Sequence, residues 1–119
     1  MDKHQAHKLL KNHMILALSE AGAYVWANET GSVQSIKGHY IQYGHKGSSD
    51  ILGVWNGKFI AIEAKTGKGV QSPQQKIFEK NVTEQRGVYY VAKWDGIEPI
   101  KDATQREVGN IRKRITRDI

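Results

Sequence analysis

Residues 47–65 read GSSDILGVWNGKFIAIEAK, and this stretch decides the fold. Two runs rich in apolar, β-branched and aromatic residues flank Asn56-Gly57, the dipeptide most typical of a two-residue hairpin turn. With that turn, Trp55 pairs with Lys58, and counting back along the ladder places Asp50 opposite Glu63. The stretch therefore predicts an antiparallel hairpin of residues 51–55 and 59–65, with two carboxylates facing each other at its open end.

The facing pair of carboxylates is the unusual feature of this hairpin. Directly opposite residues have Cβ atoms roughly 5 Å apart, and like charges placed there repel. Glu63 also lies in an otherwise apolar strand, where burying a carboxylate is costly unless something compensates it. A divalent cation would compensate both effects, because hard cations bind clustered carboxylate oxygens. We therefore expect Asp50 and Glu63 to bind Mg²⁺ or Mn²⁺, with the Ala64 backbone carbonyl as a further ligand.

Lys65 follows Glu63 by two residues and so points to the same face of the strand. A lone Glu-x-Lys is most simply an exposed ion pair at a strand end, which contributes little to stability. Beside a cation held by two carboxylates, the Lys65 ammonium group acquires a chemical role. It can assist a water molecule activated by the metal, or stabilise the negative charge that develops on a phosphoryl group.

The rest of the chain alternates helical and strand patterns. Amphipathic helices are expected over residues 5–20, from Ser72 to Gly87, and from Asp102 onward. Short strands are expected over residues 23–27, 40–43 and 88–92. The sequence shows no internal repeat, linker or second domain. We therefore expect one mixed α/β domain over residues 1–119, with the second hairpin strand at the centre of its sheet.

Apolar residues at helical spacing mark the inner face of each expected helix. They are Leu10, Met14, Ala17, Leu18 and Ala21 in the first helix, Ile77, Phe78 and Val82 in the second, and Val108, Ile111 and Ile115 in the third. Ser72 and Gln75 form a capping box around Pro73 at the start of the second helix. Asp102 and Gln105 are expected to cap the third helix.

The composition of the chain favours some classes of function and excludes others. Of the 119 residues, 18 are Lys or Arg and 12 are Asp or Glu, and the net charge of +6 favours an anionic partner such as nucleic acid. The chain has no cysteine, which excludes disulfides and thiol chemistry. It also contains no apolar run near the roughly 20 residues that span a bilayer, and no signal-like N-terminus. We therefore expect an intracellular, cytoplasmic protein.

The arrangement resembles the PD-(D/E)XK nuclease superfamily, and within it the VRR-NUC family of small virus-type nuclease domains. The family pattern is Gly-x-x-Asp, a hairpin, Glu-x-Lys, and a glutamine just inside a helix. Gly47, Asp50, Glu63, Lys65 and Gln75 match it, and the resemblance covers roughly residues 24–92. It implies a restriction-endonuclease-like core in which Asp50 and Glu63 are the metal-binding acids and Lys65 is the catalytic lysine. Gln75 would then support the active site in addition to its capping role.

Two positions depart from the family pattern. Ser49 stands where the superfamily often has proline, a change that only removes some stiffness before Asp50. The first helix begins with residues 3–7, KHQAH, whereas family members commonly place a glutamate there that faces the metal. His7 is in register with Leu10 and Met14 and therefore faces inward. It either replaces that glutamate near the metal or is a histidine satisfied by ordinary helix packing.

Stand-alone members of the family resemble Holliday-junction resolvases, which are homodimers that cut branched DNA. The resemblance therefore implies a Mg²⁺-dependent, structure-specific DNA endonuclease that acts as a homodimer, in the host cytoplasm if a phage encodes it. Phosphate contacts are expected from Lys37, Lys46, Lys68, Arg112, Lys113, Arg114 and Arg117, unless these form an ordinary solvated surface. Two other functions stay open: a nucleic-acid-binding module with a degenerate nuclease site, and a structural or regulatory partner within a larger virus complex.

Overall fold

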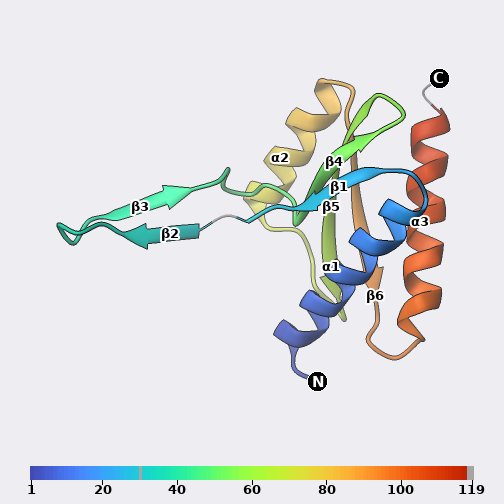
Figure 1. Ribbon diagram of the computed structural model, residues 1–119, viewed down its shortest axis with the longest axis horizontal. Helices are drawn as coiled ribbons and strands as arrows, with labels where there is room; N and C mark the ends of the chain where they lie inside the picture. Colours follow the sequence, from blue (N-terminus) through green and yellow to red (C-terminus); the bar gives the residue numbers. More distant parts are fainter. Residues whose placement is uncertain (30, 118–119) are drawn as a thin grey trace.

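The fold is mixed α/β, with a four-stranded mixed sheet flanked by three helices (Figure 1). A computed structural model describes residues 1–29 and 31–117, with the backbone alone for residues 31–33 and 41–43. The elements are α1 (Lys3–Glu20), β1 (Tyr24–Ala27), β2 (Gly31–Gln34), β3 (Tyr40–Tyr43), β4 (Ile51–Trp55), β5 (Lys58–Thr66), α2 (Pro73–Glu84), β6 (Val88–Trp94) and α3 (Ile100–Arg117). None of the helices described is both long enough and apolar enough to cross a bilayer.

The main sheet has the order β1-β4-β5-β6, and the hairpin at its centre has the predicted register. Asn56 and Gly57 both have positive φ, 51° and 79°, as a type I′ turn requires. Trp55 pairs with Lys58, and the ladder continues to the pair Ile51–Ile62. One further step brings the chain to Asp50 on one side and Glu63 on the other. β5 pairs with β4 antiparallel and with β6 parallel, which confirms it as a central strand.

Helices cover the two faces of the sheet unequally. α1 and α3 pack on the first face, where Leu10, Met14, Leu18, Ile111 and Ile115 join Ile60 and Ile62 of β5 in one buried cluster. α2 packs on the second face, where Val82 and Phe78 meet Ala61, Tyr89 and Leu52. Burying one such large apolar side chain stabilises the fold by about 1.5–3 kcal/mol.

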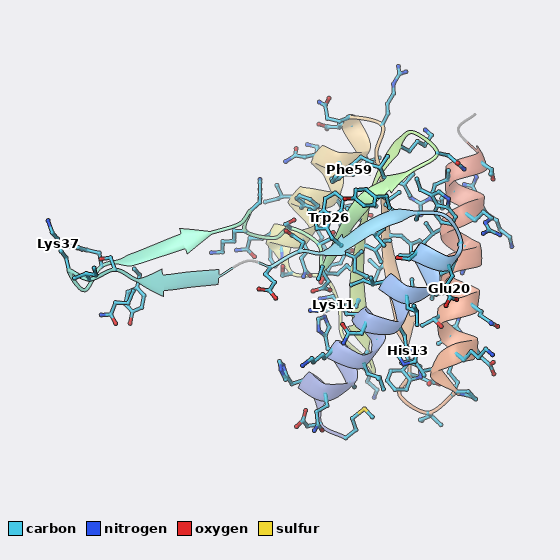
Figure 2. All side chains as sticks on the ribbon, in the orientation of Figure 1. Lys11, His13, Glu20, Trp26, Lys37 and Phe59 are labelled. Carbon is cyan, nitrogen blue, oxygen red and sulfur yellow. The ribbon has the colours of Figure 1, made fainter. Side chains whose placement is uncertain are left out.

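The second face remains open over β1 and β4, because α2 lies over β5 and β6. Tyr24, Trp26, Val54 and Phe59 keep 41–75% of their surface exposed there. Trp26 and Phe59 are labelled on this part of the sheet in Figure 2. Tyr24 pairs with Val54 and Val54 with Phe59, so these three side chains form a row across three strands.

Strands β2 and β3 form a separate antiparallel pair that extends away from the main sheet as an arm (Figure 1). β3 was expected and β2 was not. Lys37 lies at the tip of the arm, far from the body of the protein (Figure 2). We call residues 31–43 the β2–β3 arm.

Two predicted helix starts were wrong. α1 begins at Lys3 rather than at Gln5, because the Asp2 carboxylate accepts from the Gln5 N–H and forms a capping box there. α3 begins at Ile100, since the Pro99 carbonyl accepts from the N–H groups of Asp102 and Ala103. Asp102 therefore lies inside the first turn of α3 and does not cap it. β6 also runs to Trp94, two residues beyond its predicted end, because Thr66 of β5 still pairs with Trp94.

The end of α2 also differs from the prediction. The helix stops at Glu84, and the left-handed residue that follows it is Arg86, with φ 66°, rather than Gly87. Gly87 is needed for a different reason, because a Cβ there would lie 2.8 Å from Val82 Cγ1. Ile77 was predicted on the inner face but is 61% exposed, since the buried side of α2 runs through Phe78 and Val82.

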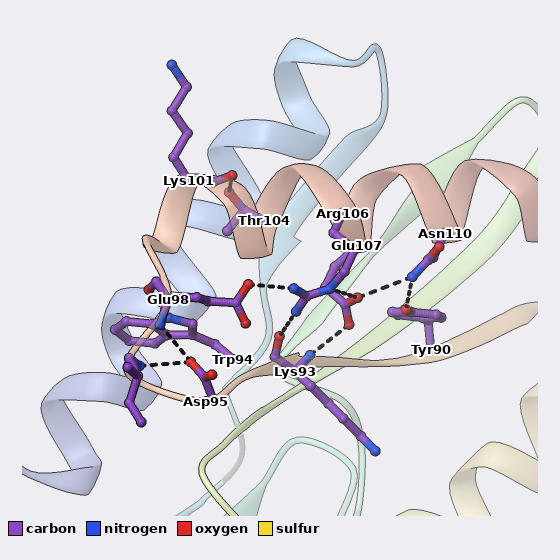
Figure 3. Close-up of polar contacts among 11 residues, drawn as sticks. Tyr90, Lys93, Trp94, Asp95, Glu98, Lys101, Thr104, Arg106, Glu107 and Asn110 are labelled. Carbon is purple, nitrogen blue, oxygen red and sulfur yellow. Dashed lines mark hydrogen bonds and ion pairs between the residues drawn. The ribbon is translucent and has the colours of Figure 1, made fainter.

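Side chains of α3 cover the open edge of β6 (Figure 3). Glu107 Oε2 accepts from the Lys93 N–H at 2.8 Å, and Arg106 donates to the Lys93 carbonyl at 3.0 Å. Arg114 donates to the Tyr89 carbonyl at 3.2 Å. An uncovered edge strand is a template for unwanted strand addition, so these contacts protect the sheet. They also give the buried Glu107 carboxylate a structural role.

Candidate active site

Polar side chains from separate elements meet at the open end of the β4–β5 hairpin. His7 comes from α1, Asp50 precedes β4, and Glu63 lies in β5. One ligand atom from each of these three residues lies within 4.8 Å of the other two, a spacing suited to a single metal ion. The sequence-predicted pair of acids is therefore brought together, and His7 joins it.

Asp50 is at the centre of this cluster. Its Oδ2 atom accepts from the Ala64 N–H at 2.8 Å and lies 3.1 Å from His7 Nε2. Burial acts to raise the pKa of this carboxyl, but hydrogen bonding to His7, Glu63 and the Ala64 N–H outweighs burial and leaves the pKa below its ordinary value. Asp50 is therefore the carboxylate that stays ionised.

The pKa of Glu63 is shifted in the opposite direction from that of Asp50. Its side chain is 3% exposed, and burial together with the neighbouring Asp50 raises its pKa to about 9, against the opposing effect of Lys65. Its Oε2 atom is buried and has no hydrogen-bond partner among the described residues. A buried polar atom without a partner costs roughly 1–3 kcal/mol. A divalent cation between Asp50 and Glu63 would satisfy that oxygen, so these residues fit Mg²⁺ or Mn²⁺.

Lys65 is held beside this cluster by Gln75 at the start of α2. Lys65 Nζ donates to Gln75 Oε1 at 3.0 Å and lies 3.8 Å from Glu63 Oε1. The same Gln75 Oε1 accepts from the Ser72 N–H at 2.8 Å, and the Gln75 N–H donates to Ser72 Oγ at 3.2 Å. Gln75 thus closes the capping box and orients Lys65 at the same time.

The segment before Asp50 is fixed by the close approach of Gly47 to α2 and by three hydrogen bonds from Asn28. Gly47 has φ 82°, and a Cβ there would lie 2.6 Å from the Gln74 carbonyl oxygen, so only glycine fits against the first turn of α2. Asn28 Nδ2 donates to Ser48 Oγ at 2.7 Å and to the Ser49 carbonyl at 2.9 Å. The Asn28 N–H also donates to the Asp50 carbonyl at 2.8 Å.

Sequence reasoning assigned no role to Asn28. The signal for it was its place at the end of the run of residues 25–28, which precedes a glycine-containing basic loop and also fits the family pattern. Ala64 takes part in the site through its N–H, which donates to Asp50 Oδ2. The role of its carbonyl as a metal ligand stays a prediction.

A pocket of about 650 Å³ opens beside the cluster. It lies between the start of α1 and the loop that follows β5. His7, Ala64, Lys65 and Lys68 are among its lining residues. The pocket therefore offers room for a ligand next to both the His7 ring and the Lys65 ammonium group.

The predicted phosphate-contacting residues are spread over the molecule. Lys68 lines the pocket beside the site, and Lys46 lies in the loop between the β2–β3 arm and Asp50. Lys37 is at the tip of the arm (Figure 2). Arg112, Lys113 and Arg114 belong to the last turns of α3, where the Arg112 guanidinium lies 5.4 Å from the centre of the Trp55 ring. Trp55 is at the turn end of the hairpin, so the α3 residues lie away from the carboxylates.

Comparison with models of known protein families and with curated proteins finds no match to this chain. The chemistry of the site therefore rests on its own geometry.

Proposed function

We propose that this protein is a Mg²⁺- or Mn²⁺-dependent endonuclease that hydrolyses phosphodiester bonds in DNA, on a restriction-endonuclease-like core of the VRR-NUC type. One observation carries the proposal. His7, Asp50 and Glu63 offer three ligand atoms within 4.8 Å of one another, and a lysine ammonium group lies 3.8 Å from Glu63. Two acids and a lysine in this arrangement suit phosphoryl transfer, where positioning and charge stabilisation supply most of the catalysis.

Each side chain has a defined task in this proposal. Asp50, ionised in the free protein, and Glu63, which must release its proton, would hold the cation, and His7 Nε2 is placed as a third ligand. A bound divalent cation supplies Lewis-acid activation of a water molecule and of a phosphoryl oxygen. Lys65 would stabilise the negative charge that develops on the phosphoryl group. Gln75 is a positioning residue that keeps the Lys65 ammonium group directed toward the site.

The substrate is proposed from charge and from the resemblance. A net charge of +6 and the lysines beside the site favour a polyanion. The preference for branched DNA and the homodimer rest on the resemblance to stand-alone VRR-NUC proteins. Cleavage of a four-way junction, a flap and a linear duplex, assayed side by side, would define the preferred structure.

The decisive experiment compares substitutions at the site with a matched control. Glu63→Gln and Lys65→Ala are expected to abolish Mg²⁺-dependent cleavage of branched DNA. Glu20→Gln and Lys101→Ala change the same charges at exposed positions of α1 and α3 and should cut at the wild-type rate. Wild-type cleavage by either site variant would refute the proposed function.

One observation favours a second candidate, a nucleic-acid-binding module without catalysis. The His7 ring already provides Asp50 with a polar partner at 3.1 Å, so Asp50 is satisfied in the absence of a cation. A mobility-shift assay in chelator, followed by addition of Mn²⁺, separates the two candidates. DNA binding with no cleavage in any divalent metal would favour the module.

A further inference from the structure

A second pocket lies at the opposite end of the main sheet, and its lining is cationic. This pocket of about 530 Å³ is lined by Lys58, Arg86, Arg114 and Arg117, together with Thr83, Gly87 and Val88. Four of these seven lining residues carry a positive charge and none carries a negative charge. We call this the basic pocket.

The basic pocket is separate from the candidate active site. Lys58 and Lys65 are the cationic residues of β5 nearest to its two ends. Seven residue steps separate them, which is about 23 Å along an extended strand. Arg86 follows α2, whereas Gln75 of the active site opens that helix. The two sites therefore occupy opposite ends of both β5 and α2.

Helix electrostatics explain part of this arrangement. A cation near a helix C-terminus is stabilised by the partial negative charge there, and Arg114 and Arg117 lie in the last turn of α3 while Arg86 follows α2. This accounts for each of the three arginines singly. It does not account for cationic side chains from the ends of two helices and one strand lining the same hollow, where like charges oppose one another.

Arg86 points to a binding role for the pocket. It has φ 66°, a left-handed conformation that glycine adopts at helix ends without strain and that costs other residues roughly 1 kcal/mol or more. Arg86 is exposed, so packing does not explain this choice of residue. The strained position places a guanidinium group at the pocket, and strain of this kind is typical of ligand-binding positions.

We propose that the basic pocket binds a phosphate of the nucleic-acid backbone at a distance from the phosphate that is cleaved. The inference rests on the proposed function for the identity of the polyanion. A separation of about 23 Å corresponds to about seven base pairs of one duplex at 3.4 Å per pair, or to a second arm of a branched substrate. Such contacts fix the register of DNA on a protein without reading its sequence. Arg86 and Arg117 are therefore positioning residues for the substrate.

The test measures DNA binding in chelator, so it does not depend on catalysis. The variant Arg86→Gln/Arg117→Gln removes two exposed cations from the pocket. The control Lys8→Gln/Lys101→Gln removes two exposed cations, one of α1 and one of α3, that do not line it. Fluorescence anisotropy with a duplex of about 30 base pairs over a range of salt concentrations gives the slope of log K against log salt. We expect the pocket variant to lower that slope by about two and the control to leave it nearly unchanged.

Equal losses in the pocket variant and the control would overturn the inference, because the pocket would then be ordinary basic surface. Titration with inorganic phosphate at fixed ionic strength adds a second readout. Phosphate that binds the wild-type pocket while the pocket variant keeps the wild-type DNA slope would also overturn it, because the pocket would hold a free anion only.

Cleavage assays give an independent readout of positioning. With a duplex of about five base pairs, too short to reach both sites, the pocket variant should cut as fast as the wild type. With long or branched DNA its kcat/KM should fall several-fold through KM. A salt slope that falls as expected in a protein that cuts no DNA would support the pocket and refute the endonuclease. Normal cleavage with an unchanged salt slope would support the endonuclease and refute the pocket.

Discussion

Acidic side chains meet near one end of β5 and basic side chains near the other, and the two groups differ in how deeply they are buried. At one end Asp50 and Glu63 are carboxylates whose pKa values are pushed apart by burial and by their partners. At the other end the guanidinium groups of Arg86 and Arg117 are exposed to solvent. Buried charges interact strongly with one another, whereas exposed charges are screened and act almost independently. Substitutions should therefore be strongly non-additive at the acidic end and additive at the basic end.

The largest effect is expected from the two acids. If the proposed cation site is correct, Asp50→Asn and Glu63→Gln should each lower the cleavage rate by about a thousandfold or more, because each would remove an oxygen ligand of the same cation. The double variant should be no slower than the worse single variant, since residues that act as a unit are not additive. Single-turnover kinetics in Mg²⁺ measures all three. Losses that multiply would show that the two acids act independently.

The stability of the metal-free protein should depend on pH through Glu63. Its pKa is raised from 4.5 to about 9, so the folded protein keeps a proton that the unfolded chain has lost. The free energy of unfolding should therefore fall as pH rises from about 4.5 toward 9, by up to about 1.4 kcal/mol per pH unit. Urea unfolding in chelator measures this slope.

Glu63→Gln is the control for that slope. A neutral side chain should flatten the pH dependence and stabilise the metal-free protein at pH values near 8. Asp50 acts in another window, because its lowered pKa gives stability that is lost only as pH falls below its ordinary value of 3.8. Saturating Mg²⁺ or Mn²⁺ should remove the slope, since a carboxylate ligand must be deprotonated, as Glu63 already is in the unfolded chain above about pH 4.5. If the pH dependence of the free energy of unfolding persists in Glu63→Gln, another titratable group causes it.

Gly47→Ala should disturb the acidic end from outside the cluster. The new Cβ would lie 2.6 Å from the Gln74 carbonyl oxygen at a φ of 82°, so Asp50 and the start of α2 must move apart. We expect a loss of about 1–3 kcal/mol in stability together with reduced cleavage. Gly109→Ala is the matched control, because a Cβ there meets nothing within 4 Å. That control should be stabilised by about 0.5–1 kcal/mol as a helical glycine replaced by alanine. Equal behaviour of the two variants would contradict the close approach at Gly47.

The two roles of Gln75 can be separated with Ser72. Ser72→Ala removes only the cap and should cost about 1 kcal/mol of stability with little change in cleavage. Gln75→Ala should cost a similar amount of stability and lower kcat about tenfold, because Lys65 loses the acceptor that orients it. Thermal unfolding and steady-state kinetics on both variants make the comparison. Equal kcat values in the two variants would show that Gln75 only caps α2 and does not orient Lys65.

The smallest effects belong to the basic pocket. Arg86→Gln and Arg117→Gln should each lower the salt slope of DNA binding by about one, and their effects should add. A double variant that loses much more than the sum would show that the exposed cations are coupled like the buried acids, and the contrast between the two ends would disappear.

The parts of this fold that the sequence predicted are those with strong local rules. Asn56-Gly57 fixed the hairpin register, and that register placed Asp50 and Glu63 together before any tertiary contact was known. The helical spacing of His7 with Leu10 and Met14 indicated its inward direction. Ser72 and Gln75 were recognisable from a capping box that acts over three residues. The membership of a nuclease family stays a prediction.

The rest depended on tertiary contacts that leave little local trace. Asp102 resembled a helix cap, but α3 had already begun at Ile100 behind Pro99. The left-handed residue after α2 is Arg86, whereas Gly87, the expected helix terminator, is needed for its close approach to Val82. The arginines of α3 could be counted in the sequence, yet only the path of α3 along β6 places them at the end of the sheet away from the acids.

The attachment of the β2–β3 arm has a consequence for how this chain can change. Ala27 and Ile51 are paired neighbours in the main sheet, so the chain departs from the core and returns to it within roughly one strand spacing, about 5 Å. Topologically the arm is an insertion, and its length can vary without a new connection in the core. The loop between β2 and β3 is therefore a natural point for grafting a peptide or a fluorophore. The length of the arm can therefore change while the paired positions Ala27 and Ile51 stay in place.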